Sequence, residues 1–284
     1  MSAAGGVARA MRWRSGMRRI SVPLWLGLGI LALLLLCAAA PQLLWPTDPL
    51  AFDFAALTAA PSWAHPFGTD QFGRDMLART IAASSVDLQI ALFSVVFPLM
   101  IGTLIGLAVG WYGGWLDAVF GRLVDLVVTF PFLVLVIAIV AVLGPGLVNM
   151  YIAVACVGWV AYARLIRGEV MVQRNSDYVA AARVLGYSTA RIVFRHILPN
   201  ALRPVLVYSV TDMALCILLG SSLGYLGLGA QPPTAEWGVL IADGKNFFTT
   251  APWITLFPGV AIVLAGLGFS LAGDGLADLL EVKR

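Results

Sequence analysis

Residues 90–112 read IALFSVVFPLMIGTLIGLAVGWY, an apolar run that contains no charged side chain. This run exceeds the roughly 20 residues that an α-helix needs to cross a bilayer. A strand of a transmembrane barrel would instead show about ten residues of alternating polarity. The run therefore predicts a membrane-spanning helix.

Five further apolar runs repeat this pattern along the chain. They cover residues 24–45, 123–143, 149–163, 202–229 and 253–272. The run 149–163 is short, but it reaches about 18 residues when it is extended back to Gly146. Only two of the six runs contain a carboxylate, Asp125 in the third and Asp212 in the fifth. The sequence thus predicts six transmembrane helices.

The composition agrees with a membrane protein. Apolar residues make up 60% of the 284 residues and charged residues only 12%, against about 25% charged residues in soluble domains. A soluble chain of this size needs more polar surface to cover its core. The same figures exclude a disordered chain and a disulfide scaffold.

The basic residues predict the orientation in the membrane. If the amino terminus is cytoplasmic, 15 of the 18 Lys and Arg residues lie inside, and only Arg74, Arg79 and Lys245 lie outside. Cytoplasmic segments carry such an excess of positive charge. We therefore expect both termini and the arginine-rich segment 164–200 to face the cytoplasm. The first run is longer than the apolar part of a signal peptide, which favours a retained helix.

Sequence signals for catalysis are weak. Residues 220–224 read GSSLG and fit the G-x-S-x-G template of hydrolases, but they lie within an apolar run. Small residues that allow close helix packing explain them better, and Gly102, Gly106 and Gly110 indicate the same at four-residue spacing. The chain has no phosphate-binding loop and no HExxH metal motif. We expect no enzymatic activity, no metal site and no nucleic-acid partner.

The segment 164–200 contains two short helical patterns. Gly186 separates them, and Ser188 can cap the second. Physical reasoning leaves two interpretations open. The segment is either a knob that fits a groove on a cytoplasmic partner or an amphipathic connector on the membrane surface.

The residues of this segment resemble the coupling loop of ABC-importer permeases. The matching residues are Ala181, Ala182, Gly186, Ile192, His196, Leu198, Pro199 and Asn200. Ala180 stands where the family has a glutamate. Further stretches narrow the resemblance to the C-type permease subunit of peptide and nickel importers. They are HPFGTDQFGRD at 65–75, YGGWLD at 112–117, LGLG at 226–229, QPP at 231–233 and GDGL at 273–276.

This resemblance, which runs from about residue 24 to residue 280, implies an architecture. The fold would be all-α and integral to the membrane, with six transmembrane helices in the type I ABC-importer permease fold. Residues 1–45 would form a basic cytoplasmic tail and the first helix, and 46–85 an extracytoplasmic segment. Residues 86–276 would form the permease core with five helices and the coupling loop 164–200, and 277–284 a cytoplasmic tail.

The resemblance also implies partners and a place in the cell. These are a related permease subunit, two cytoplasmic ATPases and an extracytoplasmic substrate-binding protein, in a bacterial inner membrane. ATP and Mg would bind the ATPases, and this chain would hold no cofactor. The coupling residues would be Ala180, Ala181, Ala182, Arg183, Gly186, Ile192, His196, Pro199 and Asn200.

Residues of the substrate path are expected around Asp212, because a carboxylate within a span usually faces a cavity or a partner. Tyr208, Ser221 and Ser222 complete this set. The alternative for Asp212 is a structural hydrogen bond to a neighbouring helix.

Six residues are candidates for docking the binding protein: Asp70, Arg74, Asp75, Glu236, Trp237 and Asp243. Alternatively, Asp70 with Arg74 and Asp75 with Arg79, both at i,i+4 spacing, staple a short helix.

The expected cargo is a di- or oligopeptide, with nickel or a metal chelate as the alternative within the family. A membrane scaffold without transport activity is the alternative from a different class.

Overall fold

The computed structural model describes residues 22–280, and every named element in this range is a helix. The basic residues before position 20 and at positions 283 and 284 lie outside the described residues. The elements are α2 (Val22–Ala39), α3 (Pro41–Leu44), α4 (Met76–Tyr112), α5 (Gly114–Val128), α6 (Phe132–Leu143), α7 (Leu147–Gln173), α8 (Asp177–Val184), α9 (Thr189–Arg191), η1 (Ile192–Ile197), α10 (Leu198–Tyr225), α11 (Trp237–Gly244), η2 (Lys245–Phe247) and α12 (Trp253–Leu280).

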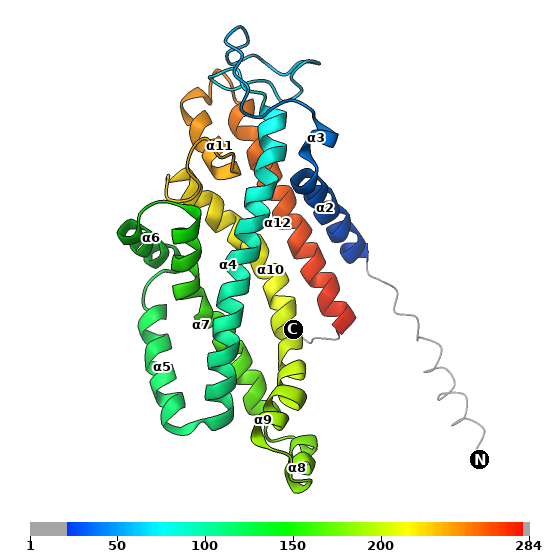
Figure 1. Ribbon diagram of the computed structural model, residues 1–284, viewed down its shortest axis with the longest axis vertical. Coiled ribbons are helices and arrows are strands. Elements are labelled where there is room, and N and C mark those ends of the chain that lie inside the picture. Colours follow the sequence, from blue (N-terminus) through cyan, green and yellow to red (C-terminus); the bar gives the residue numbers. More distant parts are fainter. Residues whose placement is uncertain (1–21, 281–284) are drawn as a thin grey trace, which may run out of the picture.

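The long helices run side by side along the length of the molecule (Figure 1). Helix α4 packs against α7 and α10, and α12 packs against α2 and α10. One end of the bundle carries α11 and the irregular segment 45–75, and we call it the α11 end. The opposite end carries α8 and α9, and we call it the α8 end.

Within residues 22–280, five helices are long and apolar enough to cross a membrane, and the bent pair of α5 and α6 makes a sixth crossing if it counts as one span. The expected all-α membrane fold is therefore confirmed, whereas the side that each end faces remains a prediction. The run 123–143 does not form one continuous helix, because α5 and α6 meet at 85° within it. Pro131 explains the break: it lacks an N–H, and its ring clashes with the preceding helical turn.

Helix boundaries also differ from the apolar runs. Helix α2 ends at Ala39, two residues before Pro41. Helix α4 begins at Met76, well before the apolar run, because Asp75 caps it by accepting a hydrogen bond from the Ala78 N–H. Helix α7 continues to Gln173, so residues 164–173 of the expected loop are helical.

Glycines bring α4 and α7 into close contact, as their spacing predicted. A Cβ atom on Gly106 would lie 2.5 Å from the Ala163 carbonyl oxygen, and one on Gly102 would lie 2.6 Å from that of Trp159. Neither position has room for a side chain. This contact holds α7, and with it one wall of the site described next, against the centre of the bundle.

Candidate functional site

The turn between α8 and α9 has a well-defined geometry at the α8 end. Gly186 has φ +75°, and its N–H donates to the Arg183 carbonyl oxygen at 3.0 Å. The Tyr187 N–H donates to the Ala182 carbonyl oxygen at 3.1 Å. These two bonds form a Schellman motif, which favours glycine because of the positive φ. Ser188 then caps α9 by accepting from the Arg191 N–H. The structure confirms the two short helices and the break at Gly186.

One face of α8 is buried and the other is free. Val179 and Ala182 are buried in a cluster that includes Ile192 and Ile197. The opposite face leaves Val184 89% exposed and Leu185 70% exposed. Among the other expected coupling residues, Ala180, Ala181, Arg183, Gly186 and Pro199 are exposed, and His196 and Asn200 are half-buried.

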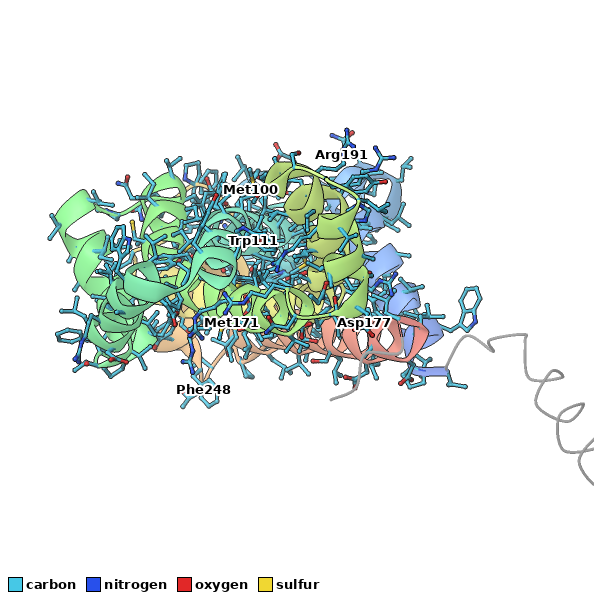
Figure 2. All side chains as sticks on the ribbon, turned by 90° about the horizontal axis from the view of Figure 1, so that it is seen from below. Met100, Trp111, Met171, Asp177, Arg191 and Phe248 are labelled. Atoms are coloured by element: carbon cyan, nitrogen blue, oxygen red, sulfur yellow. The ribbon has the colours of Figure 1, made fainter. Side chains whose placement is uncertain are left out.

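Contacts connect this segment to the spans. The Arg183 guanidinium lies 5.2 Å from the centroid of the Trp111 ring at the end of α4. The His196 ring stacks on Tyr187 at 5.7 Å. Seen from the α8 end, Trp111 lies within the bundle and Arg191 points away from it (Figure 2). Helices α9, η1 and α10 follow one another without a break, so the segment is continuous with a membrane span.

A groove of about 790 Å³ opens between α5, α6, α7 and α10, and Ser94 and Pro98 of α4 also line it. Tyr208 and Asp212 both line it, and their role in a substrate path stays a prediction. The Tyr162 hydroxyl donates a hydrogen bond to Asp212 Oδ2 at 2.7 Å. Asp212 therefore has the interhelical bond that the structural alternative required, and it also faces a cavity.

Ser221 and Ser222 do not line this groove, and their place in a substrate path stays a prediction. The Ser221 side chain is buried and lies 3.4 Å from Asp87 Oδ1. The Ser222 hydroxyl donates to the Leu218 carbonyl oxygen in its own helix. Sequence reasoning missed Tyr162 and Arg164, which line the groove from α7.

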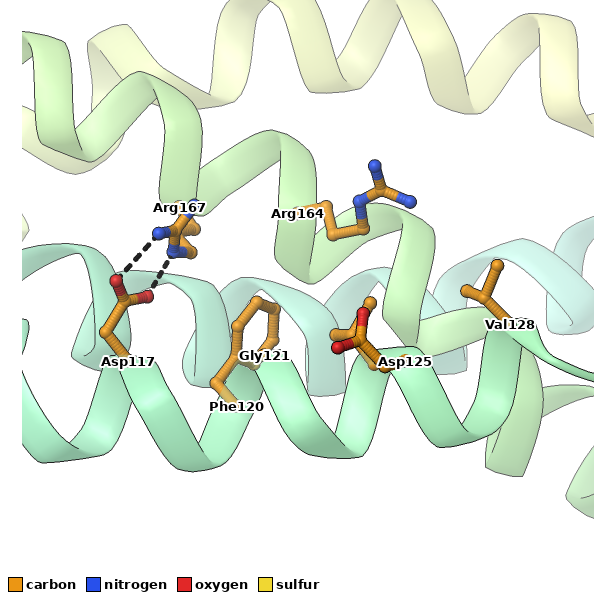
Figure 3. Close-up of a pocket in the computed structure, with 8 residues that line it drawn as sticks. Asp117, Phe120, Gly121, Asp125, Val128, Arg164 and Arg167 are labelled. Atoms are coloured by element: carbon orange, nitrogen blue, oxygen red, sulfur yellow. Dashed lines mark hydrogen bonds and ion pairs between the residues drawn. The ribbon is translucent and has the colours of Figure 1, made fainter.

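A smaller pocket of about 260 Å³ adjoins the groove between α5 and α7 (Figure 3). Arg167 donates two hydrogen bonds to the Asp117 carboxylate, at 2.5 and 2.8 Å. Arg164 lies one turn before Arg167 and borders both cavities. Sequence reasoning placed Arg164 and Arg167 in the arginine-rich segment and Asp117 in the stretch YGGWLD, but it did not predict this ion pair.

A buried charge cluster occupies the α11 end. Asp70 Oδ2 accepts from Arg74 Nε at 2.6 Å and from Arg79 Nη1 at 3.1 Å. Asp243 lies 3.7 Å from Arg74 and 3.5 Å from Arg79. Burial raises the pKa of Asp243, and the two arginines oppose this shift. The cluster fastens the segment 45–75 to α4 and α11.

The predicted i,i+4 staple is therefore half correct. Asp70 pairs with Arg74, but neither residue is in a helix. Asp75 does not pair with Arg79; it caps α4 and bonds His65 Nδ1 at 2.9 Å. Asp75 can make these two contacts because Arg79 forms an ion pair with Asp70 instead.

The docking prediction is corrected for five of its six residues. The side chains of Asp70, Arg74, Asp75, Glu236 and Trp237 are buried within the chain. Direct contact with another protein requires an accessible side chain. Asp243 alone in this set keeps a partly exposed side chain, at 31%.

Glu236 and Trp237 instead join α11 to α4. Glu236 caps α11 by accepting from the Gly238 and Val239 N–H groups, at 2.7 and 2.9 Å. The Trp237 N–H donates to Asp87 Oδ2 at 3.1 Å, and its indole Nε1–H donates to the Thr80 carbonyl oxygen at 3.0 Å. These bonds hold the α11 end together.

Chemistry for catalysis is not apparent in either cavity. Among residues 22–280, no group of three or more His, Cys, Asp or Glu side chains is placed to hold a metal ion. The groove has largely apolar walls with a few polar groups, the composition of a small-molecule binding site. The arrangement suits binding and passage of a solute.

Comparison with known proteins identifies the family. Residues 102–284 match the family described as the binding-protein-dependent transport system inner membrane component. The dipeptide transport system permease protein DppC of Alkalihalophilus pseudofirmus is 43% identical over 223 residues, which cover 78% of this chain and 73% of that protein. The probable D,D-dipeptide transport system permease protein DdpC of Escherichia coli is 42% identical, with 89% and 85% covered. The glutathione transport system permease protein GsiD of Pectobacterium atrosepticum is 39% identical, with 95% and 91% covered. The chain therefore belongs to the family of binding-protein-dependent transport system inner membrane components, as a multi-pass protein of the bacterial inner membrane.

Proposed function

We propose that this chain is one permease subunit of an ATP-driven importer of di- or oligopeptides. The observation that carries the proposal is identity of about 40% over most of the chain to permeases named for dipeptide, D,D-dipeptide and glutathione transport. In this proposal a related permease completes the translocation path. Two ATPases bind the α8 end, and a binding protein delivers cargo at the α11 end.

The α8 segment is the proposed contact with an ATPase. Its free face carries the apolar side chains Val184 and Leu185, which suit a groove on a partner. Ala180, in place of the family glutamate, is also exposed, so this part of the contact is apolar. Since α9, η1 and α10 are continuous, a push on this segment moves α10 and Asp212 as one body.

This chain would not hydrolyse ATP, because it lacks a phosphate-binding loop. ATP and Mg would bind the partner ATPases.

Peptides are favoured over nickel as the cargo. The relatives quoted above are named for peptides or glutathione. The groove offers one carboxylate and one buried thiol, which is a poor set of ligands for nickel.

Reconstitution of the complete complex in proteoliposomes tests the proposal. With ATP inside and binding protein outside, we expect uptake of radiolabelled dipeptide that stops when either is omitted. Nickel uptake is measured in parallel. ATP-dependent uptake of nickel but not of dipeptide would identify nickel as the cargo. No uptake of any solute would favour the scaffold alternative.

A further inference from the structure

The groove between α5, α6, α7 and α10 is apolar except at a few positions. Two charged side chains line it, Asp212 from α10 and Arg164 from α7. Asp212 lies within the apolar run of its span, where a charge is costly unless it faces a cavity or a partner, and Arg164 lies directly after the apolar run of α7. A site with one charge of each sign suits a dipolar ligand.

Asp212 is held in place on one side only. Its Oδ2 atom accepts from the Tyr162 hydroxyl, and Tyr162 is itself 1% exposed. The Tyr162 ring packs edge-on against Tyr208 at 5.3 Å, which fixes its position. Among residues 22–280, no hydrogen bond to Asp212 Oδ1 and no cation within 4 Å of the carboxylate are found. One oxygen is therefore free to accept from a ligand.

Arg164 also lacks a carboxylate partner in the described part of the chain. Its neighbour Arg167 is paired with Asp117, and Figure 3 draws no bond between Arg164 and Asp125. The Arg164 side chain is exposed at the border of the groove. A guanidinium in this state is a ready partner for a carboxylate, which it can bind with two parallel hydrogen bonds.

We infer that the groove binds a peptide through its two charged termini. Asp212 accepts from the α-ammonium group, with the Tyr208 ring beside it, and Arg164 donates to the α-carboxylate. The apolar walls, which include Phe132 and Leu219, accept side chains of varied type. The volume of about 790 Å³ lies within the usual range for small-molecule sites. This inference rests on the proposed function and gives the cargo path its recognition residues.

Three ligands separate the two contacts: alanyl-alanine, its N-acetyl form and its C-terminal amide. Equilibrium binding of each is measured on the assembled permease–ATPase complex in nanodiscs without binding protein. The wild-type complex should bind alanyl-alanine about tenfold or more tightly than either capped form, because each cap removes a charge-assisted contact.

Single substitutions should act on one terminus each. Asp212→Asn should reduce affinity for alanyl-alanine about tenfold and leave the N-acetyl form unchanged. Arg164→Gln should reduce affinity for alanyl-alanine about tenfold and leave affinity for the C-terminal amide unchanged. Tyr162→Phe should weaken binding of the two ligands with a free α-amino group and leave binding of the N-acetyl form unchanged. The matched controls Glu169→Gln on α7 and Arg122→Gln on α5 do not line the groove, and they should bind all three ligands like the wild type.

Several results would overturn the inference. Equal weakening for capped and free peptides would indicate a structural role, or for Arg164 a lipid or partner-subunit contact. Unchanged affinities, or no binding of alanyl-alanine to the wild type at millimolar concentration, would also reject it. Uptake by the wild-type complex is measured in the same preparation. If the wild-type complex takes up no dipeptide, the proposed function is rejected. If it takes up dipeptide normally but the variants bind all three ligands like the wild type, only this inference is rejected.

Discussion

Asp70 balances two buried arginines and is the centre of the charge cluster at the α11 end. The side chains of Asp70 and Arg79 are both about 2% exposed. Asp70 also accepts backbone hydrogen bonds from Phe72 and Arg74, at 2.8 and 3.0 Å. Removing one partner from such a cluster leaves an uncompensated buried charge.

Asp70→Asn should therefore destabilise the protein by about 3–5 kcal/mol. Asp243→Asn is the matched control, because it faces the same arginines from a half-exposed position at 3.5 and 3.7 Å. It should cost about 0–1 kcal/mol. Thermal unfolding of the assembled complex in detergent measures both. Equal losses would show that Asp70 is not the main counter-charge.

Gly186 is the residue on which the shape of the proposed coupling segment depends. A side chain there meets no atom within 4 Å, so the cost of a substitution comes from φ +75° alone. This backbone region costs an L-residue about 1–2 kcal/mol. Gly186→Ala should thus weaken the Schellman motif without creating a clash.

The expected result is loss of coupling with the complex still assembled. Uptake per ATP hydrolysed should fall severalfold in proteoliposomes. Gly168→Ala in α7 is the control, since that position is equally open and has an ordinary helical φ. It should behave like the wild type. If Gly186→Ala still couples uptake fully to ATP hydrolysis, the fixed turn at Gly186 is not required for coupling.

At the scale of elements, a pair of carboxyl groups joins α4 to α11. Glu236, the buried cap of α11, lies close to Asp87, which is buried in α4 and accepts from the Trp237 N–H at 3.1 Å. Ser221 of α10 contacts Asp87 as well. Burial raises the pKa of Glu236, and the hydrogen bonds from Gly238 and Val239 oppose the shift.

The sign of the pH dependence follows from this shift. An acid with a raised pKa in the folded state keeps its proton while the unfolded chain releases it. Stability is then greatest below the ordinary pKa of a glutamate and falls as the pH rises toward the raised value. The slope is at most about 1.4 kcal/mol per pH unit for one proton.

Asp87→Asn removes one of these two neighbouring buried carboxyl groups and keeps an oxygen that can accept from the Trp237 N–H. As the pH rises above the ordinary pKa of a glutamate, the thermal midpoint of the wild type should fall, and the midpoint of this variant should fall less. Asp125→Asn, an exposed carboxylate on α5, is the control and should keep the wild-type slope. A steeper slope in Asp87→Asn would contradict coupling between the two carboxyl groups.

Periodicity and hydropathy predict the positions of the membrane spans well. Apolar runs located every span, because burial in lipid requires them. They did not locate the helix ends, since those depend on local chemistry. Pro131 breaks one run into two helices, and the cap at Asp75 starts α4 before its apolar part.

At the scale of the whole molecule, the site depends on contacts that the sequence does not reveal. Tyr162 and Asp212 lie 50 residues apart, and Asp87 and Trp237 lie 150 apart. The turn at Gly186 was predictable because its signal is local. The burial of Glu236 and Trp237 was not, because it results from the packing of α11 against α4.

Orientation in the membrane is the last property of the whole molecule that the charge pattern predicts. Among the described basic residues, those that lie at the α8 end include Arg183, Arg191 and Arg195, and those at the α11 end include Arg74, Arg79 and Lys245. At the α11 end, both arginines are neutralised by Asp70 and Asp243. Apart from Lys245, the unneutralised positive charge of these six residues is therefore at the α8 end, which should remain in the cytoplasm. Two exposed positions report the two sides: Val184 at 89% and Trp63 at 101% exposure. In a chain without its native cysteines, Val184→Cys should react with a membrane-impermeant maleimide in inside-out vesicles only, and Trp63→Cys in right-side-out vesicles only. The reverse pattern would invert the topology and place α8 out of reach of a cytoplasmic ATPase, which would also reject its proposed role in coupling.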